Sequence, residues 1–344
     1  MEKTYDLRSD TVTLHSREMR KAMSRADVGD DVYMEDATVN KLQEQACRVT
    51  GKRDALFIPS GSMGNLIPLF VNGGRGNEVL AQENSHILHY ELASAAALAG
   101  VLPVAVKGER GVLQPEELEK HLRPEVYYMP KTTMVEVEST HNREGGTYYT
   151  PDELKNVSEF AKKHEMKVHL DGARIFNASV ALGVPVKRMA MHADTMTFCL
   201  SKGLGAPVGA LLCGSQKFIE EARRLRKMLG GGMRQAGIIA AAGLYALEHN
   251  VERLAEDHAN AKRIAERLAD TDWASIDPEQ VETNIIIFET PAQPAQQVAS
   301  ALKKRGILCG PFGSNSIRMV THIGISREDT DKITSIIRDL KIQR

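Results

Sequence analysis

The sequence has few cysteines and no long apolar run. Its 344 residues include four cysteines, none in a Cys-x-x-Cys pair, which excludes a disulfide scaffold and a cysteine-based zinc site. No stretch approaches the roughly 18 uninterrupted apolar residues of a membrane-spanning helix. Met1–Asp6 lacks the apolar segment behind a basic head that a secretory signal has. We therefore expect a cytoplasmic protein with no membrane partner.

An excess of charge is also missing. The chain has 44 Lys and Arg against 45 Asp and Glu, a formal net charge of −1, so it lacks the basic surface typical of nucleic-acid-binding proteins. Neither a Gly-x-x-x-x-Gly-Lys-Ser/Thr loop nor a Gly-x-Gly-x-x-Gly turn is present where a nucleotide-binding enzyme or a dehydrogenase would need it. Hydrophobic residues make up 42%, an ordinary share for a globular protein, and the length suits two domains.

Up to about residue 230, short apolar runs alternate with longer amphipathic stretches. Short apolar runs are typical of buried strands, and amphipathic stretches are typical of helices that cover a sheet. The alternation predicts βαβ units and an α/β fold with a mostly parallel sheet of seven strands. The expected strands are Ala55–Pro59, Glu78–Ala81, Leu102–Val106, Met134–Val137, Lys167–Leu170, Thr195–Leu200 and Val208–Cys213. The expected helices are Asn65–Val71, His89–Ala99, Pro115–Leu122, Pro151–His164, Ile175–Leu182 and Gln216–Met228.

The pattern changes after Gly232. Met233–Glu248 and Val251–Leu268 have the pattern of two long helices, and shorter strands and helices follow them. We expect a large α/β domain over residues 1–250 and a smaller α+β domain over residues 251–344.

Lys202 and Asp171 are the residues that point most directly to chemistry. Each ends an expected strand, and they lie 202 − 171 = 31 residues apart, about one βαβ crossover. Their side chains should therefore meet at the edge of the sheet where open α/β folds bind ligands. Pyridoxal phosphate enzymes need such a pair, a lysine for the Schiff base and a carboxylate for the pyridine nitrogen. Taken alone, Lys202 also fits a surface lysine and Asp171 a helix N-cap.

A turn of small residues, Ser60-Gly61-Ser62, follows an expected strand and begins a helix. The free N–H groups and the dipole of a helix N-terminus suit a phosphate group. Two histidines follow the next strand. His86 can stack on a flat ring, and His89 lies three residues on, within reach of the same helix face. No third ligand stands at metalloprotease spacing, so we expect no metal site, and both histidines also fit a structural role.

With these residues in place, the chain resembles the L-threonine aldolases, pyridoxal phosphate enzymes of fold type I with an aspartate-aminotransferase-like fold. The resemblance covers nearly the whole chain, and its motifs follow one another in the family's order. They are Asp6–Thr11, Val28–Tyr33, Ser60–Asn65, Glu138–Asn142, His169–Ala178, Leu200–Pro207, Gly230–Gln235 and Arg318–His322.

The resemblance implies a role beside the cofactor for each matching residue. Lys202 forms the Schiff base, Asp171 faces the pyridine nitrogen and Arg174 faces the phenolic oxygen. His86 stacks on the ring. The phosphate lies against the small-residue turn and the residue before Lys202, with help from an arginine of a neighbouring subunit: Ser60, Gly61, Ser62, Ser201 and Arg234.

The resemblance also implies how an amino acid substrate binds. Ser9 and Arg318 hold its carboxylate, Arg318 as a bidentate fork, with Arg174 close by. Tyr33 enters from a neighbouring subunit, and Lys227 lines the same mouth. These roles require a homodimer or a homotetramer with shared active sites.

Two positions depart from the family pattern. Ser62 stands where relatives usually carry threonine, a change that keeps the hydroxyl group. Tyr128 stands where some relatives have a second active-site histidine, so no acid–base role is carried over to it.

The activity that the resemblance implies is reversible aldol cleavage of L-threonine, L-allo-threonine and related β-hydroxy-α-amino acids to glycine and an aldehyde. The base that takes the β-hydroxyl proton is His86, His89 or a water held by one of them. The Lys202–Asp171 pair is equally compatible with a transaminase, a β-eliminating lyase or a decarboxylase of the same fold. A cofactor-binding protein without catalysis would need neither this pair nor a carboxylate clamp.

Overall fold

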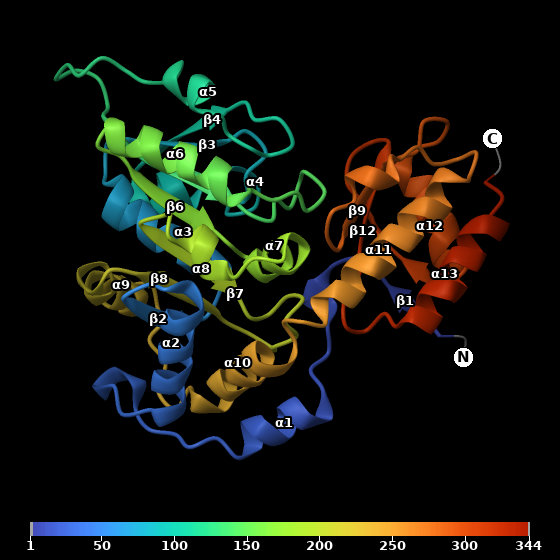
Figure 1. Cartoon of the computed structure of the whole chain (residues 1–344), viewed down its shortest axis with the longest axis horizontal. Coiled ribbons are helices and arrows are strands. Elements are labelled where there is room, and N and C mark those ends of the chain that lie inside the picture. Colours follow the sequence, from blue (N-terminus) through green and yellow to red (C-terminus); the bar gives the residue numbers. More distant parts are fainter. Residues whose placement is uncertain (1–2, 343–344) are drawn as a thin grey trace.

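The computed structural model describes residues 3–342, and its larger part is built on a seven-stranded sheet (Figure 1). Strand β8 is antiparallel to both of its neighbours, and all other neighbouring strands are parallel. The mostly parallel seven-stranded sheet predicted from the sequence is therefore confirmed. In spatial order the strands are β2 (Asp54–Ile58), β8 (Ala210–Gly214), β7 (Thr195–Cys199), β6 (Lys167–Asp171), β5 (Thr132–Glu138), β3 (Glu78–Gln82) and β4 (Leu102–Val106).

Helices cover both faces of this sheet because successive strand side chains face opposite ways. Phe57 packs beneath α2 (Ala37–Thr50), in the same core that α6 (Pro151–Lys163) covers further along the sheet. Its neighbours Leu56 and Ile58 pack beneath α3 (Gly61–Pro68) and α9 (Gln216–Met228). Thr150 caps α6 through a capping box with Glu153.

The expected helix over His89–Ala99 is not continuous. Two short helical turns replace it, α4 (His86–His89) and η4 (Ala95–Ala99). Between them Leu92 and Ala93 have left-handed φ angles of 53° and 55°, which a right-handed helix cannot include. In this interrupted segment the Glu91 side chain is buried and hydrogen-bonded to Asn65 and His86. The contact with Asn65, which is far from Glu91 in the sequence, outweighs the local preference for a continuous helix.

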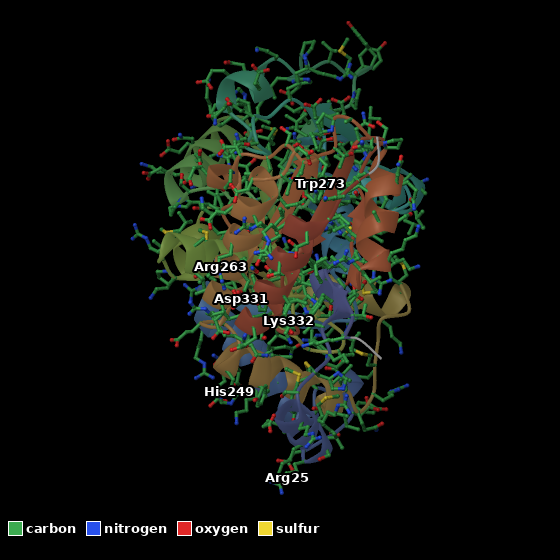
Figure 2. All side chains as sticks on the ribbon, turned by 90° about the vertical axis from the view of Figure 1, so that its right-hand side faces the viewer. Arg25, His249, Arg263, Trp273, Asp331 and Lys332 are labelled. Carbon is green, nitrogen blue, oxygen red and sulfur yellow. The ribbon has the colours of Figure 1, made fainter. Side chains whose placement is uncertain are left out.

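The C-terminal part, which faces the viewer in Figure 2, forms a second core around a small antiparallel sheet. Trp273 lies in this core, and an ion pair between Arg263 and Asp331 joins two of its helices. Its elements are α11 (Leu254–Ala269), β9 (Ile285–Glu289), α12 (Ala295–Lys304), β10 (Ile307–Leu308), β11 (Gly310–Pro311), β12 (Ser316–Val320) and α13 (Arg327–Asp339).

The N-terminal segment connects this core to the large sheet domain. Strand β1 (Tyr5–Asp6) pairs with β10 in parallel, and Leu7 lies in the C-terminal core (Figure 1). Further along, α1 (Arg17–Ser24) packs against α10 (Gly237–His249) of the large part. The residues between β1 and α1 therefore cross from one core to the other. The domain boundary between residues 250 and 251 stays a prediction.

The four cysteines are free thiols, and Cys199 and Cys213 are buried. Within residues 3–342, no helix has both the length and the apolar character needed to cross a membrane.

Candidate active site

Lys202 and Asp171 lie at adjacent strand ends. Asp171 is the last residue of β6 and pairs in register with Thr197 of β7, and Lys202 follows three residues after β7 ends. The Lys202 ammonium group has no hydrogen bond or ion pair with any residue in the described part of the chain. Its charge does act on Asp171, whose pKa it lowers. The structure thus brings together the two residues that the sequence singles out.

The carboxylate of Asp171 is fixed and ionised although it is buried. Its Oδ2 accepts a hydrogen bond from Asn65 Nδ2 at 2.7 Å, and its Oδ1 accepts one from the Ala173 amide at 3.0 Å. Burial raises the pKa of Asp171, but the charges of His86 and Lys202 and the Asn65 hydrogen bond outweigh that effect and leave the pKa below its usual value. A buried anion of this kind can keep a ring nitrogen protonated.

Behind Asp171 lies a neutral histidine. His169 is fully buried on β6, and burial lowers its pKa to about 4. Because it is neutral near pH 7, one ring nitrogen donates and the other accepts. Nε2 lies 3.2 Å from Asn65 Oδ1, and Nδ1 lies 3.0 Å from Thr195 Oγ1. His169 therefore holds Asn65, which in turn holds Asp171.

His86 faces the same group of residues. Its backbone amide donates to Glu138 Oε2 at 2.8 Å, and its Nδ1 lies 2.8 Å from Glu91 Oε1. One ring nitrogen of His86 and one carboxylate oxygen each of Glu91 and Asp171 all lie within 4.8 Å of one another. His89 is placed differently. It is exposed, and its Nε2 donates to the Glu83 carbonyl at 2.9 Å.

The small-residue turn lies at the start of α3, as its sequence predicts. Ser60 is the N-cap, and its hydroxyl accepts a hydrogen bond from the Met63 amide. Gly61 lies close to the end of β7, since a Cβ atom on it would come within 2.7 Å of Cys199 Sγ. Ser62 is exposed on the first turn. The helix start therefore remains open to an anion. Ser201 is half-buried in the turn after β7.

Arg174 is engaged within the chain. Its Nε and Nη2 donate to the two carboxylate oxygens of Asp10, both at 2.7 Å, and both side chains are buried. Burial raises the pKa of Asp10, but Arg174 and the nearby Lys202 charge bring it far below its usual range. Asn284 of the C-terminal part also donates to Asp10, at 3.4 Å. Asp10 thus holds Arg174 where the two cores meet.

Arg318, unlike Arg174, has no carboxylate partner among the described residues. It lies on β12, donates to Asn142 Oδ1 at 2.7 Å and to the Arg8 carbonyl at 3.4 Å, and has no ion pair within the described residues. Burial and the positive charge of Arg174 lower its pKa. Ser9 precedes Asp10, and its hydroxyl accepts a hydrogen bond from the Thr11 amide. An uncompensated guanidinium beside the site suits an anionic ligand.

Three predicted site residues lie on the surface of the chain. Tyr33 is 70% exposed, Lys227 is exposed at the end of α9, and Arg234 is exposed with one ion pair, to Asp30 at 3.0 Å. Tyr128 is also exposed, in the segment before β5. No hydrogen bond within residues 3–342 links Tyr33, Lys227 or Arg234 to Lys202 or Asp171.

Sequence reasoning assigned no role to Asp10, Asn65 or Glu91, although Asp10 and Asn65 lie in motifs that it identified and Glu91 lies in an expected helix. Asn65 and Glu91 are 2% and 6% exposed, and Asp10 is fully buried. The available signal was a polar residue in an apolar setting, since Asn65 precedes Leu66, Ile67 and Pro68 on α3. Buried polar groups need partners, and here those partners are site residues.

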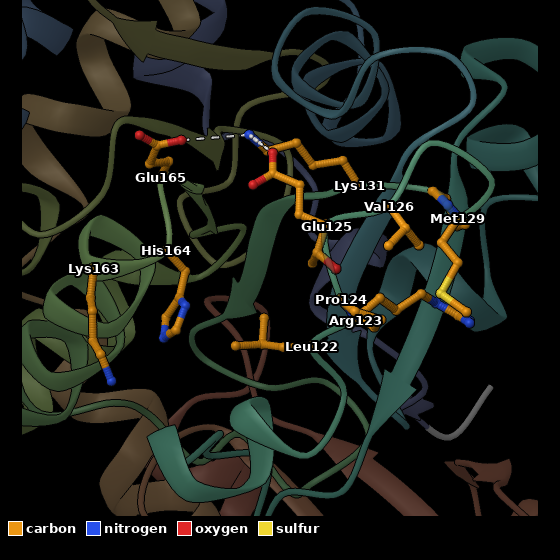
Figure 3. A pocket seen from close by; sticks show the side chains of 12 residues that line it. Leu122, Arg123, Pro124, Glu125, Val126, Met129, Lys131, Lys163, His164 and Glu165 are labelled. Carbon is orange, nitrogen blue, oxygen red and sulfur yellow. Dashed lines mark ion pairs between the residues drawn. The ribbon is translucent and has the colours of Figure 1, made fainter.

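The pocket in Figure 3 lies elsewhere. Lys131 bridges two exposed carboxylates in it, at 3.7 Å from Glu125 and 3.5 Å from Glu165, and none of the residues discussed above lines it. Its lining carries surface ion pairs and no cluster suited to chemistry.

Comparison with known proteins agrees with the geometry. Low-specificity L-threonine aldolase 1 of Arabidopsis thaliana is 43% identical over 335 residues, which are 95% of this chain and 93% of that protein. Low specificity L-threonine aldolase of Escherichia coli (strain K12) is 41% identical over 331 residues, 96% of this chain and 97% of that protein.

The solved structures agree on the fold. Threonine aldolase of Leishmania major matches with a TM-score of 0.83 at 20% identity, over 98% of this chain and 99% of that one. Serine palmitoyltransferase of Sphingomonas wittichii matches with a TM-score of 0.77 at 18% identity, over 98% and 87%. The predicted fold, that of the fold type I pyridoxal phosphate enzymes, is confirmed.

The family model of the beta-eliminating lyases matches residues 6–291, most of the chain. Together with the curated relatives at more than 40% identity, this match shows that the chain belongs to the beta-eliminating lyase family and, within it, to the low-specificity L-threonine aldolases.

Proposed function

We propose that this chain holds pyridoxal phosphate on Lys202 and cleaves L-threonine, L-allo-threonine and related β-hydroxy-α-amino acids to glycine and an aldehyde. The observation that carries the proposal is the placement of Lys202 beside the buried, ionised Asp171 at the ends of two parallel strands. The membership of the chain in the low-specificity L-threonine aldolases supports the same reaction.

The residues at these strand ends fit pyridoxal phosphate. The Lys202 side chain has no partner among the described residues and is available to the cofactor aldehyde, and Asp171 is an acceptor for the protonated ring nitrogen of the cofactor. The open start of α3 at Ser60, Gly61 and Ser62 suits its phosphate group. Bound there, the cofactor supplies an electron sink that accepts the electrons of the breaking Cα–Cβ bond.

The side chains around the cofactor bind and orient the substrate and take its proton. Arg318 and Ser9 bind the substrate carboxylate, which fixes the orientation of the Cα–Cβ bond. By remaining an anion, Asp171 keeps the ring nitrogen of the cofactor protonated. His86 takes the proton of the β-hydroxyl group, since it lies in one cluster with Asp171 and Glu91, whereas His89 is exposed and outside that cluster.

A second copy of the chain completes the site in this proposal. Tyr33, Lys227 and Arg234 are exposed, and each has a cofactor or substrate role that the chain does not fulfil on its own. A symmetric assembly would bring each of them to the neighbouring site. The subunit number, two or four, and the cytoplasmic location stay predictions.

Incubation of the purified holoprotein with L-threonine and L-allo-threonine tests the reaction. Acetaldehyde, trapped by a coupled alcohol dehydrogenase, is the expected product, in amounts equal to glycine. Lys202→Ala should abolish its release and the yellow colour of the bound cofactor, whereas Lys217→Ala, at an exposed lysine of α9, should leave both unchanged. Formation of 2-oxobutyrate with ammonia would instead identify a β-eliminating lyase, and transfer of the amino group to a keto acid an aminotransferase.

A further inference from the structure

A continuous hydrogen-bond network joins His86 to Asp171. His86 Nδ1 lies 2.8 Å from Glu91 Oε1, and Asn65 Nδ2 donates to the same Glu91 oxygen at 2.8 Å. Asn65 Nδ2 also donates to Asp171 Oδ2 at 2.7 Å. His86, expected above the cofactor ring, and Asp171, expected at the ring nitrogen, are therefore positioned by one continuous chain of hydrogen bonds.

The orientation of the Asn65 amide is determined by its surroundings. Its Nδ2 faces the carboxylates of Glu91 and Asp171, and its Oδ1 lies 3.2 Å from His169 Nε2. An amide turned the other way would place its oxygen against two carboxylates. Asn65 is buried on α3, directly after the turn that begins this helix, so the network is anchored to the rigid part of the fold.

We propose that Glu91 is a positioning residue for aldol cleavage: its carboxylate, held in place by Asn65, binds His86 Nδ1 and leaves Nε2 as the ring atom that takes the substrate β-hydroxyl proton. This inference rests on the function proposed above and deepens it, because it names the base and the group that orients it.

The tautomer of His86 follows from this contact. A neutral imidazole carries one N–H and one lone pair, and a carboxylate at Nδ1 requires the N–H to be there. Nε2 then carries the lone pair, and it has no hydrogen bond to any residue in the described part of the chain. A buried acid that orients a histidine base is a recurring arrangement in enzymes.

The charges around His86 favour its protonated form. Burial alone lowers the pKa of His86, but the Glu91 hydrogen bond and the charges of Asp171, Glu91 and Glu138 raise it above its usual value. On the other side, the Tyr90 ring lies 5.3 Å from His86, with the Arg143 guanidinium 5.8 Å above that ring. The base is the neutral ring, so cleavage should increase as pH rises through the pKa of His86.

Glu91→Gln provides the main test. Glutamine keeps the shape and an acceptor oxygen but removes the charge, so the pKa of His86 falls. The acid limb of kcat/KM for L-threonine should move to lower pH by about one unit. The ring-nitrogen NMR titration of His86, recognised as the signal missing in His86→Asn, should move by the same amount. Glu83→Gln, at an exposed carboxylate of the same segment, should move neither.

Glu91→Ala separates position from charge. With no acceptor at Nδ1 the ring is free to turn, and kcat should fall about 10- to 100-fold while KM changes by less than about threefold. An acid limb and a His86 titration that both stay in place in Glu91→Gln would overturn the proposal.

If these variants do not fold, the tautomer of His86 can still be measured in the wild-type protein. Its neutral His86 should show a protonated Nδ1 and an unprotonated Nε2, and the opposite tautomer would overturn the proposal. The NMR readout does not depend on turnover. A wild type that fails to release acetaldehyde would refute the proposed function, whereas an unmoved His86 titration in an active Glu91→Gln would refute this inference alone.

Discussion

Arg174 and Arg234, the two arginines expected beside the cofactor, have contrasting surroundings. Arg174 is buried and bound through two hydrogen bonds of 2.7 Å to Asp10. Arg234 is exposed and makes one contact of 3.0 Å with Asp30. A buried bidentate pair is a fixed part of the fold, whereas an exposed single contact is easily exchanged for another partner. The comparison distinguishes Arg174, whose contacts one chain completes alone, from Arg234, whose side chain is available to a second copy.

The largest effect is expected from Arg174→Ala. This change leaves the Asp10 carboxylate buried without its main partner, with only partial compensation from Lys202. Unfolding free energy at pH 7, measured with urea, should fall by about 3–5 kcal/mol.

The pH dependence of that loss has a definite sign. The pKa of Asp10 is lowered in the folded chain, so the stabilisation is fully present above the ordinary aspartate pKa near 4 and is lost as pH falls below it. The gap between wild type and Arg174→Ala should therefore close in acid. Arg224→Ala, at a highly exposed arginine of α9, should change stability little. If Arg174→Ala lost as little unfolding free energy as Arg224→Ala, the buried Asp10–Arg174 pair would not be the fixed part of the fold that the comparison with Arg234 implies.

The intermediate effect tests whether Arg234 serves the active site of the neighbouring subunit. Arg234→Ala and Lys202→Ala should each be poorly active, but an equal mixture refolded together should recover about a quarter of wild-type activity. Half of randomly formed dimers are mixed, and each mixed dimer has one intact site if Arg234 serves the neighbouring copy. Mixing Lys202→Ala with Asp171→Ala is the matched control and should recover none, since both residues belong to one site. Recovery no greater than in that control would show that Arg234 serves the site of its own subunit and not that of the neighbouring copy.

The smallest effect is expected from Asp30→Asn. The Asp30–Arg234 pair is exposed, and asparagine can still cap the turn by accepting from the Val32 amide. Unfolding free energy should change by less than about 1 kcal/mol. Asp31→Asn next to it offers a sharp contrast, because Asp31 pairs with Arg226 at 2.5 Å and both are buried. Equal losses for the two variants would mean that burial does not decide the strength of these pairs.

The sequence predicted the sheet and the Lys202–Asp171 pair because both depend on local patterns: short apolar runs, and polar residues where those runs end. It predicted a single helix over His89–Ala99 because the alanines there favour one. The interruption depends on Glu91 reaching Asn65, which lies 26 residues earlier in the chain. The pairing of Asp10 with Arg174 spans 164 residues and leaves no local trace in the sequence. Contacts of this kind are decided by the assembled fold.

The pairing of β1 with β10 has a consequence for synthesis on the ribosome. Tyr5 and its partner Ile307 lie 307 − 5 = 302 residues apart, so β10 leaves the ribosome long after β1. During that interval Ser9 and Asp10, which lie within four residues of the end of β1, lack the strand pairing that holds the segment before them. A nascent chain can therefore form the large sheet and place Lys202 beside Asp171 before the segment that holds Ser9 is fixed. The carboxylate site that we propose needs both Ser9 and Arg318, so it forms after the large sheet.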